Sequence, residues 1–141
     1  MMVNEFSLFS RIENESILND PLFRWAQSCV NELLSDENLL SKLTDDKLQP
    51  DILSLNAAVR NKRFELMDAL IKQYAIVPDE STLGNAISSG NIDIVKKFVE
   101  THSIHVEEHH INCAEIYKHT DIEQYLKNEI HVVRARWNLI K

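Results

Sequence analysis

Residues 81–100, STLGNAISSGNIDIVKKFVE, decide the fold. The stretch predicts two helices joined by a tight turn at Gly90, and its apolar residues recur along the chain. Ala58, Ala86 and Ala114 follow one another at a constant 28-residue interval. Three sets of larger residues keep that interval: Leu55, Leu83 and Ile111; Leu66, Ile94 and Ile122; Leu70, Phe98 and Leu126. Such an interval is typical of stacked repeats, which build binding surfaces.

The composition favours an all-helical protein, because the 141 residues include only two glycines and three prolines. No segment approaches the roughly 20 apolar residues that a membrane-spanning helix needs. The first residues lack a basic region followed by an apolar stretch, so we expect no signal peptide. Cys29 and Cys113 have no cysteine partners at motif spacing. We therefore expect buried thiols in a reducing compartment and a cytoplasmic location.

The net charge of −7 argues against nucleic-acid binding, which needs a basic surface. An acidic protein of this kind suits a basic partner. The charge is uneven, since residues 131–141 contain three basic residues and no acidic residue.

We expect residues 1–49 to form an N-terminal helical cap. A short helix is predicted around residues 6–12. Asp20 and Pro21 predict the start of a second helix, with an apolar face that extends to Leu33. Ser35 is expected to cap a third helix.

Residues 50–130 are expected to form a short helical-repeat solenoid of three helix-turn-helix repeats, at about 50–78, 79–106 and 107–130. The predicted helices cover residues 52–61, 64–74, 82–89, 92–102 and 110–118, and a last helix runs from 121 onward. Lys62 and Lys118 stand where the middle repeat has Gly90, so their turns should be more strained or differently shaped.

Residues 131–141 are expected to extend the last helix as a basic, amphipathic C-terminal segment. In one interpretation, Ile130, Val133 and Trp137 pack on the last repeat as its cap. The alternatives are a helix for a partner or for self-association, and contact with a membrane surface.

The middle repeat resembles the ankyrin repeat, in which T-P-L-H-x-A is followed by a glycine turn and an I-V-x-x-L-L helix. The matching residues are Thr82, Leu83, Ala86, Gly90, Ile94, Val95, Phe98 and Val99. The first repeat matches at Leu55, Ala57, Ala58, Leu66, Leu70 and Ile71, and the third at Ile111, Ala114, Ile122 and Leu126. The proline and histidine of the motif are absent, and the 28-residue interval is shorter than the usual value of about 33.

The resemblance implies a protein-protein interaction module with short loops in place of the ankyrin β-hairpins. Similar divergent repeats occur in host-targeting effectors of intracellular bacteria and large DNA viruses, which would place the chain in a host cytosol. We expect no enzymatic activity and no cofactor. The expected partner-binding residues are Arg60, Asn61, Tyr74, Asn85, Ser88, Ser89, His102 and Tyr117, with Cys113 on the same helix-lined face.

An alternative function is a zinc-dependent hydrolase. His105, Glu108 and His109 fit the H-x-x-E-H zinc pattern, with a third ligand from Glu115, Glu123 or Glu129. The run is predicted to lie in a loop, which does not favour this site. The five histidines between residues 102 and 119 could instead form a pH-sensitive patch. A further alternative is an oligomerisation or scaffold module that pairs through the C-terminal helix.

Overall fold

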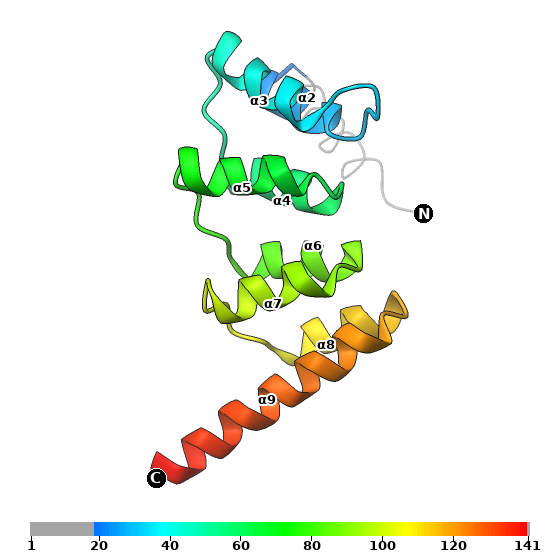
Figure 1. The fold of residues 1–141 in the computed structure, drawn as a ribbon, viewed down its shortest axis with the longest axis vertical. Coiled ribbons are helices and arrows are strands. Elements are labelled where there is room, and N and C mark those ends of the chain that lie inside the picture. The colour runs from blue at the N-terminus through cyan, green and yellow to red at the C-terminus, as the bar shows by residue number, and fades with distance from the viewer. Residues whose placement is uncertain (1–18, 141) are drawn as a thin grey trace, which may run out of the picture. The chain divides into compact units, whose positions relative to one another are not determined.

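The computed structural model describes the backbone of residues 19–140 and, in that range, every side chain except those of residues 133–135, 137, 138 and 140. Within this range the regular elements are eight α-helices and no strand, so the all-α prediction is confirmed (Figure 1). The helices are α2 (Pro21–Ser28), α3 (Asp36–Asp45), α4 (Ile52–Arg60), α5 (Phe64–Gln73), α6 (Glu80–Ser89), α7 (Ile92–Glu100), α8 (Glu108–Ile116) and α9 (Thr120–Ile140). The chain divides into two compact units, unit 1 (Met1–Tyr74) and unit 2 (Ala75–Lys141).

The helices predicted from the 28-residue interval are confirmed from α4 to α9, with bounds within two residues of those expected. The register residues of the interval are buried, apart from Ile94, which is half-buried. The helix predicted around residues 6–12 lies outside the described residues.

The N-termini of α4, α6 and α8 share one local structure. Their N-cap residues, Asp51, Asp79 and Glu107, keep the 28-residue interval. Each N-cap N–H donates to a side chain three residues later, in three pairs: Asp51 to Ser54 Oγ at 3.1 Å, Asp79 to Thr82 Oγ1 at 3.0 Å, and Glu107 to His110 Nδ1 at 3.0 Å. Because helix starts leave backbone donors without intrahelical partners, this contact ties the entering chain to each helix.

Left-handed backbone conformations recur at the same interval in two series. After the first helix of each pair, φ is 61° at Lys62, 82° at Gly90 and 60° at Lys118. After the second helices, φ is 54° at Lys47, 55° at Ala75 and 56° at Ser103. The turns at Lys62 and Lys118 therefore have the left-handed conformation of Gly90, in which a β-carbon costs about 1–2 kcal/mol. The two lysine turns share the left-handed conformation of the Gly90 turn, so of the two alternatives strain remains the expectation.

In unit 1, α2 packs on α3 and α4, and α5 packs on α3 and α4. Trp25 is a core residue, and its indole N–H donates to the carbonyl of Leu39 at 2.7 Å. Leu39 and Leu43 are fully buried beside it in the core of the unit. Trp25 therefore holds α2 against α3, because its apolar ring is buried and its indole N–H is hydrogen-bonded.

The apolar face predicted to extend to Leu33 is wrong. Helix α2 ends at Ser28, and Leu33 is 91% exposed. Cys29, Val30 and Asn31 donate instead to carbonyls three residues earlier, which tightens the chain into turns. The Asn31 side chain then accepts the N–H of Leu33, an Asx contact that competes with helix continuation.

In unit 2 the packing follows the same plan: α6 contacts α7 and α8, and α9 contacts α7 and α8. Phe98, Ile122 and Leu126 are fully buried between these helices. Residues 74–79 and 101–107 contain no strand, in agreement with the short loops expected there.

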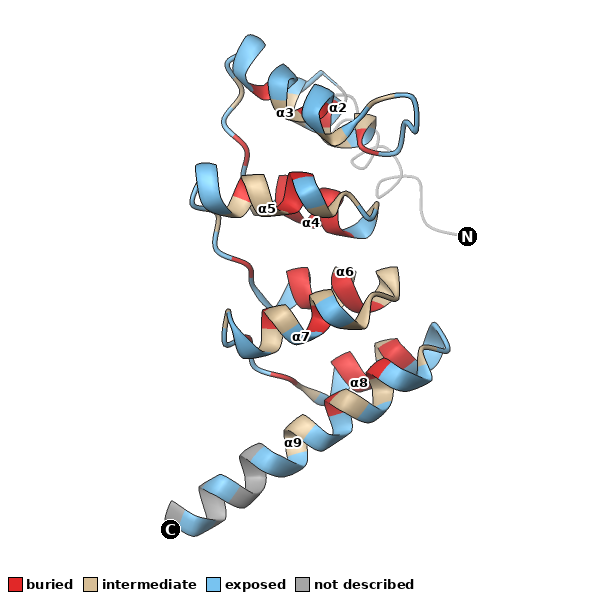
Figure 2. Ribbon diagram, in the orientation of Figure 1, coloured by how far each residue is buried: buried red, intermediate tan, exposed pale blue. Residues whose placement is uncertain are grey.

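Helix α9 has 21 residues, which confirms the long C-terminal helix predicted from the sequence. Its buried residues lie in its first half, and Figure 2 shows the described part of its second half exposed. Of the three residues expected to cap the last repeat, Ile130 is half-buried, and the side chains of Val133 and Trp137 lie outside the described set. Among the described residues, no helix has the length and apolar character to cross a membrane.

Candidate functional site

The expected partner-binding residues of unit 1 lie at the two ends of α5. Arg60 is exposed in the last turn of α4, and Asn61 follows it as the C-cap, with its amide donating to the carbonyl of Ala57 at 2.8 Å. Tyr74 is half-buried and caps the other end of α5. Because α5 has 10 residues, about 15 Å of helix separates Tyr74 from Arg60 and Asn61.

In unit 2, the expected residues of α6 use their side-chain donors on their own helix. Asn85 donates to the carbonyl of Ser81 at 2.9 Å. The hydroxyls of Ser88 and Ser89 donate to the carbonyls three residues earlier, at 2.9 and 2.6 Å. A hydroxyl that donates once still has lone pairs to accept with, so both serines can receive a hydrogen bond from a partner.

The ends of α6 and α8 form one surface, which we call the turn surface: Ser88, Ser89, Ile116, Tyr117 and His119. His119 Nε2 lies 3.4 Å from the carbonyl oxygen of Ser88. The rings of Tyr117 and His119 stack, with centroids 6.3 Å apart and an interplanar angle of 8°. Ile116 and Tyr117 are 74% and 54% exposed. An aliphatic and an aromatic side chain are therefore held in solvent beside polar groups.

Gly90 makes room for this arrangement. A β-carbon at Gly90 would lie 2.8 Å from Cε1 of His119, closer than side chains tolerate. The glycine therefore serves both the left-handed turn and the approach of the imidazole.

Sequence reasoning identified Tyr117 but missed Ile116 and His119. The repeat interval carried a signal for Ile116, because it stands one interval after Ser88 and two intervals after Arg60, at a solvent position of the register. An apolar residue at a position otherwise occupied by polar residues is a candidate contact.

His102 does not join the turn surface. It follows α7 at the end remote from Gly90, and its ring lies 5.6 Å from that of Phe98. Cys113 lies in α8 between the two ends of the helix, with Sγ 4.0 Å from the carbonyl oxygen of Gly84.

The H-x-x-E-H residues are not brought together as a zinc site. His105 lies in the linker, while Glu108 and His109 open α8. In the described part of the chain, one group has metal-ligand atoms within 4.8 Å of one another, and it consists of Glu80, Glu107 and His109. Nδ1 of His109 already lies 3.3 Å from a carboxylate oxygen of Glu107. The positive N-termini of α6 and α8 account for both carboxylates without a cation.

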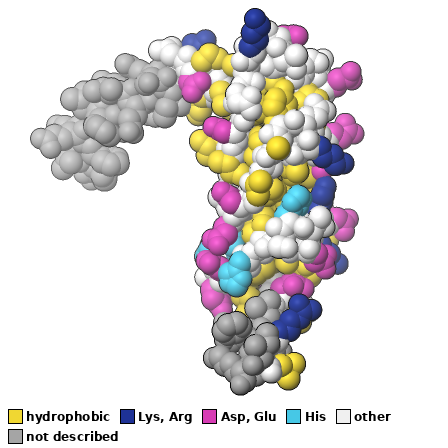
Figure 3. Space-filling view, turned by 90° about the vertical axis from the view of Figure 1, so that its left-hand side faces the viewer, with side chains coloured by type: hydrophobic (Ala, Val, Ile, Leu, Met, Phe, Trp, Pro, Cys, Tyr) yellow, Lys and Arg dark blue, Asp and Glu magenta, His cyan; other side chains and the backbone are white. Residues whose placement is uncertain are grey.

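One histidine of the cluster is structural. His110 is 1% exposed, accepts the N–H of Glu107 at Nδ1, and lies with Nε2 3.2 Å from the carbonyl oxygen of Glu80. A carbonyl can only accept, so the neutral ring carries its proton on Nε2. Burial lowers the pKa of His110, which favours this neutral form. Figure 3 shows histidine side chains on the molecular surface among acidic ones.

The two thiols are poor nucleophiles. Burial raises the pKa of Cys29 to about 11, and it also raises the pKa of the half-buried Cys113. Nucleophilic catalysis needs the opposite shift, because the thiolate is the reactive species. The prediction of a buried thiol is confirmed for Cys29 and holds in part for Cys113.

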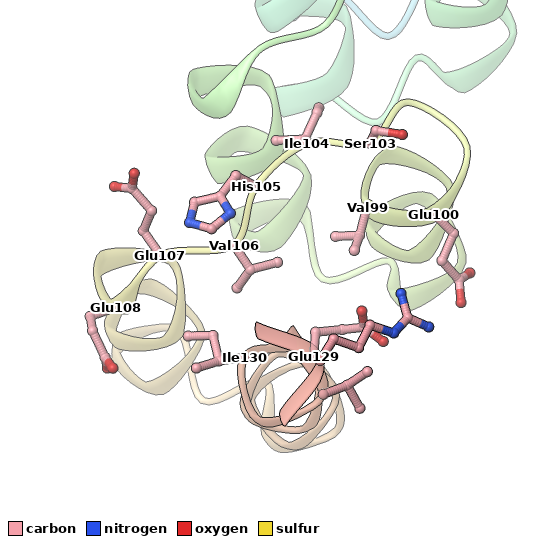
Figure 4. Close-up of a pocket in the computed structure, with 12 residues that line it drawn as sticks. Val99, Glu100, Ser103, Ile104, His105, Val106, Glu107, Glu108, Glu129 and Ile130 are labelled. Atoms are coloured by element: carbon pink, nitrogen blue, oxygen red, sulfur yellow. The ribbon is translucent and has the colours of Figure 1, made fainter. Parts of the chain in front are cut away.

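A groove of about 750 Å³ lies in unit 2 between the end of α7, the linker residues 103–107 with Glu108 at the start of α8, and residues 129–136 of α9. We call it the α9 groove. Figure 4 shows Val99 and Val106 pointing into it, with Glu100 and Glu108 at its outer edge. Burial, together with the charges of Glu129 and Glu100, raises the pKa of Tyr125 to about 12. The described lining of the groove includes four glutamates and one arginine, so negative charge is in excess there.

Comparison of the chain with protein-family models, with curated proteins and with solved structures finds no match.

Proposed function

We propose that the chain is a helical repeat protein of ankyrin-like design that binds another protein through the turn surface. The observation that carries the proposal is the exposure of Ile116 and Tyr117, at 74% and 54%, beside the stacked ring of His119. Tyrosine is among the residues that dominate binding energy at protein interfaces. A tyrosine fixed by a ring stack also loses little conformational entropy when it is covered.

The repeat part of the proposal rests on the 28-residue interval. Three N-cap structures and two series of left-handed residues recur at that interval. In each unit the first helices pack on first helices and the second on second. Stacked helix pairs present the ends of their first helices side by side, and such a surface is suited to binding a partner.

The chemistry of binding is complementarity without a covalent step. Ile116 and Tyr117 would enter a shallow apolar site on the partner, while Ser88 and Ser89 would accept hydrogen bonds at the edge. Interfaces combine an apolar centre with a polar rim in this way. A partner with a basic rim is favoured by the net charge of −7.

Affinity capture with matched variants tests the proposal. The double variant Ile116→Ser, Tyr117→Ser removes both anchors, and Leu53→Ser is the control because Leu53 is also exposed, at 69%, but lies in α4. We expect a protein that wild type and the control capture equally, and that the double variant captures about tenfold less. All three proteins should give the same helical circular dichroism spectrum. Equal capture by all three would contradict the proposal.

A further inference from the structure

The α9 groove exists because the chain departs from its own period. Lys47, Ala75 and Ser103 leave the second helices in a left-handed conformation, at the same 28-residue interval. The next position of that series is His131, which lies inside α9. The helix therefore continues at the position where the 28-residue interval would place a linker. The linker at residues 103–107 and the start of α8 lie across the groove from α9.

The continued helix carries exposed apolar residues. Val132 is 44% exposed and Leu139 is 87% exposed. They are seven residues apart, which places them on one face two turns from each other. The groove is itself lined by apolar side chains, among them Val99, Ile104 and Val106. Covering either apolar surface removes it from water, which is favourable in free energy.

The charges of the two surfaces are opposite. Four glutamates line the groove, Glu100, Glu107, Glu108 and Glu129, against one cationic side chain among its described lining residues, Arg136 of α9 itself. Residues 131–140 of α9 include two basic residues, Arg134 and Arg136, and no acidic one in their sequence. One chain thus carries both an acidic apolar groove and a basic apolar helix. A second copy of the chain therefore offers complementary charge, and it is the occupant that the charges favour over an unrelated helix.

We propose that the α9 groove binds the C-terminal half of α9 from a second copy, in an antiparallel two-fold pair. In such a pair each helix contributes to the groove of the other, so both interfaces form at once. Glu129 and Arg136 share the face of Val132, because they stand three residues before it and four after it. Antiparallel pairing around Val132 sets Glu129 of one copy opposite Arg136 of the other, twice.

Charge exchange between these two positions tests the proposal. The single variants Glu129→Arg and Arg136→Glu each place like charges together, and the double variant Glu129→Arg, Arg136→Glu restores opposite ones. We expect wild type to dimerise by analytical ultracentrifugation. Each single variant should dimerise about tenfold more weakly, and the double variant should match wild type within about threefold. An equimolar mixture of the two single variants should form heterodimers. Lys72→Glu, on the exposed surface of α5, is the control for net charge and should match wild type.

Three results would overturn the proposal. The first is a wild-type protein that stays monomeric up to about 100 µM, a concentration at which even weak interfaces associate. The second is single variants that dimerise as well as wild type. The third is a double variant and a mixture that both stay as weak as the single variants. If wild type gives the first of these results and yet binds a synthetic basic amphipathic peptide in the groove, the occupant is a foreign helix.

Discussion

The guanidinium of Arg63 and the carboxylate of Asp36 lie 3.2 Å apart, with side chains only 15% and 18% exposed. The same guanidinium donates to the carbonyls of Cys29, Asn31 and Leu34, at 3.0, 2.6 and 2.7 Å. The other oxygen of Asp36 accepts the N–H of Leu66 at 3.2 Å. Helix α5, whose own N-cap residue makes no side-chain cap, is thus capped by a carboxylate from α3.

Replacing Arg63 with alanine should therefore destabilise unit 1. The change leaves Asp36 and three carbonyls without this donor, and breaking a largely buried pair costs about 3 kcal/mol. Arg63→Lys should recover only part of the loss, because an ammonium group cannot reach all four acceptors at once. Urea unfolding followed by circular dichroism measures both. The control is Lys72→Ala, an exposed change on α5, and a loss from Arg63→Ala no larger than from this control would contradict the network's role.

The left-handed lysines predict a gain in stability. Lys62 has φ of 61°, so Lys62→Gly removes the strain of a β-carbon there. We expect the free energy of unfolding to rise by about 0.5–1 kcal/mol after the entropy of glycine is counted. Lys62→Ala keeps the β-carbon and should give no gain. Thermal denaturation compares the two, and equal stability of the glycine and alanine variants would show that the turn is not strained.

His110 predicts a loss of stability in acid. Its pKa in the folded protein is lowered from the ordinary 6.5, mainly by burial, and His109 acts in the same direction while Glu80 and Glu107 oppose it. The neutral ring is therefore favoured by folding. This contribution is complete above pH 6.5 and is lost as the pH falls through the lowered value. Protonation also removes the acceptor for the Glu107 N–H.

The matched change is His110→Thr, because Thr82 makes the equivalent cap in α6. Free energies of unfolding from urea titrations between pH 7.5 and about 5 should fall less in this variant than in wild type. His105→Thr, a change at an exposed histidine in the linker before α8, should keep the wild-type slope. An unchanged slope in His110→Thr would assign the acid sensitivity elsewhere.

The thiols should differ in reactivity. At pH 8 a thiol with a pKa of about 11 is ionised to about one part in a thousand, so Cys29 should resist a disulfide reagent until unit 1 unfolds. Cys113 is half-buried and should react slowly in the native protein. The Cys113→Ser variant isolates Cys29. Release of one equivalent of chromophore from that native variant, as fast as in urea, would contradict the burial of Cys29.

The sequence predicted the helices because one physical requirement repeats. Ala58, Ala86 and Ala114 are fully buried where helices approach closely, and their spacing located α4 to α9. Contacts between distant residues carry no such period. Asp36 of α3 reaches Leu66 of α5, and Glu80 approaches Glu107 and His109 from another helix. These pairings follow from packing, so the sequence pattern could not identify them.

The candidate site was predicted in part for the same reason. Tyr117 was predicted from its position on the expected helix-lined face. His119 joins the turn surface through its approach to Gly90 and Ser88, which come about 30 residues earlier in the chain. The wrong expectation for Leu33 arose from a local competition. Apolar spacing favoured a longer α2, but the Asn31 side chain turns the chain away from the helix.

The 28-residue repeat is the claim on which the binding proposal depends, and deletion of one period tests it most directly. Removing residues 75–102 deletes α6 and α7 and joins Tyr74 to Ser103. Ser103 then takes the place of Ala75, and both residues have a left-handed conformation. If the helix pairs are copies of one stacking unit, the shortened chain refolds with α8 and α9 on the preceding pair. Hydrogen exchange should then show protected amides throughout α8, with one cooperative unfolding transition. Amides of α8 that exchange at the rate of an unfolded chain would contradict the repeat.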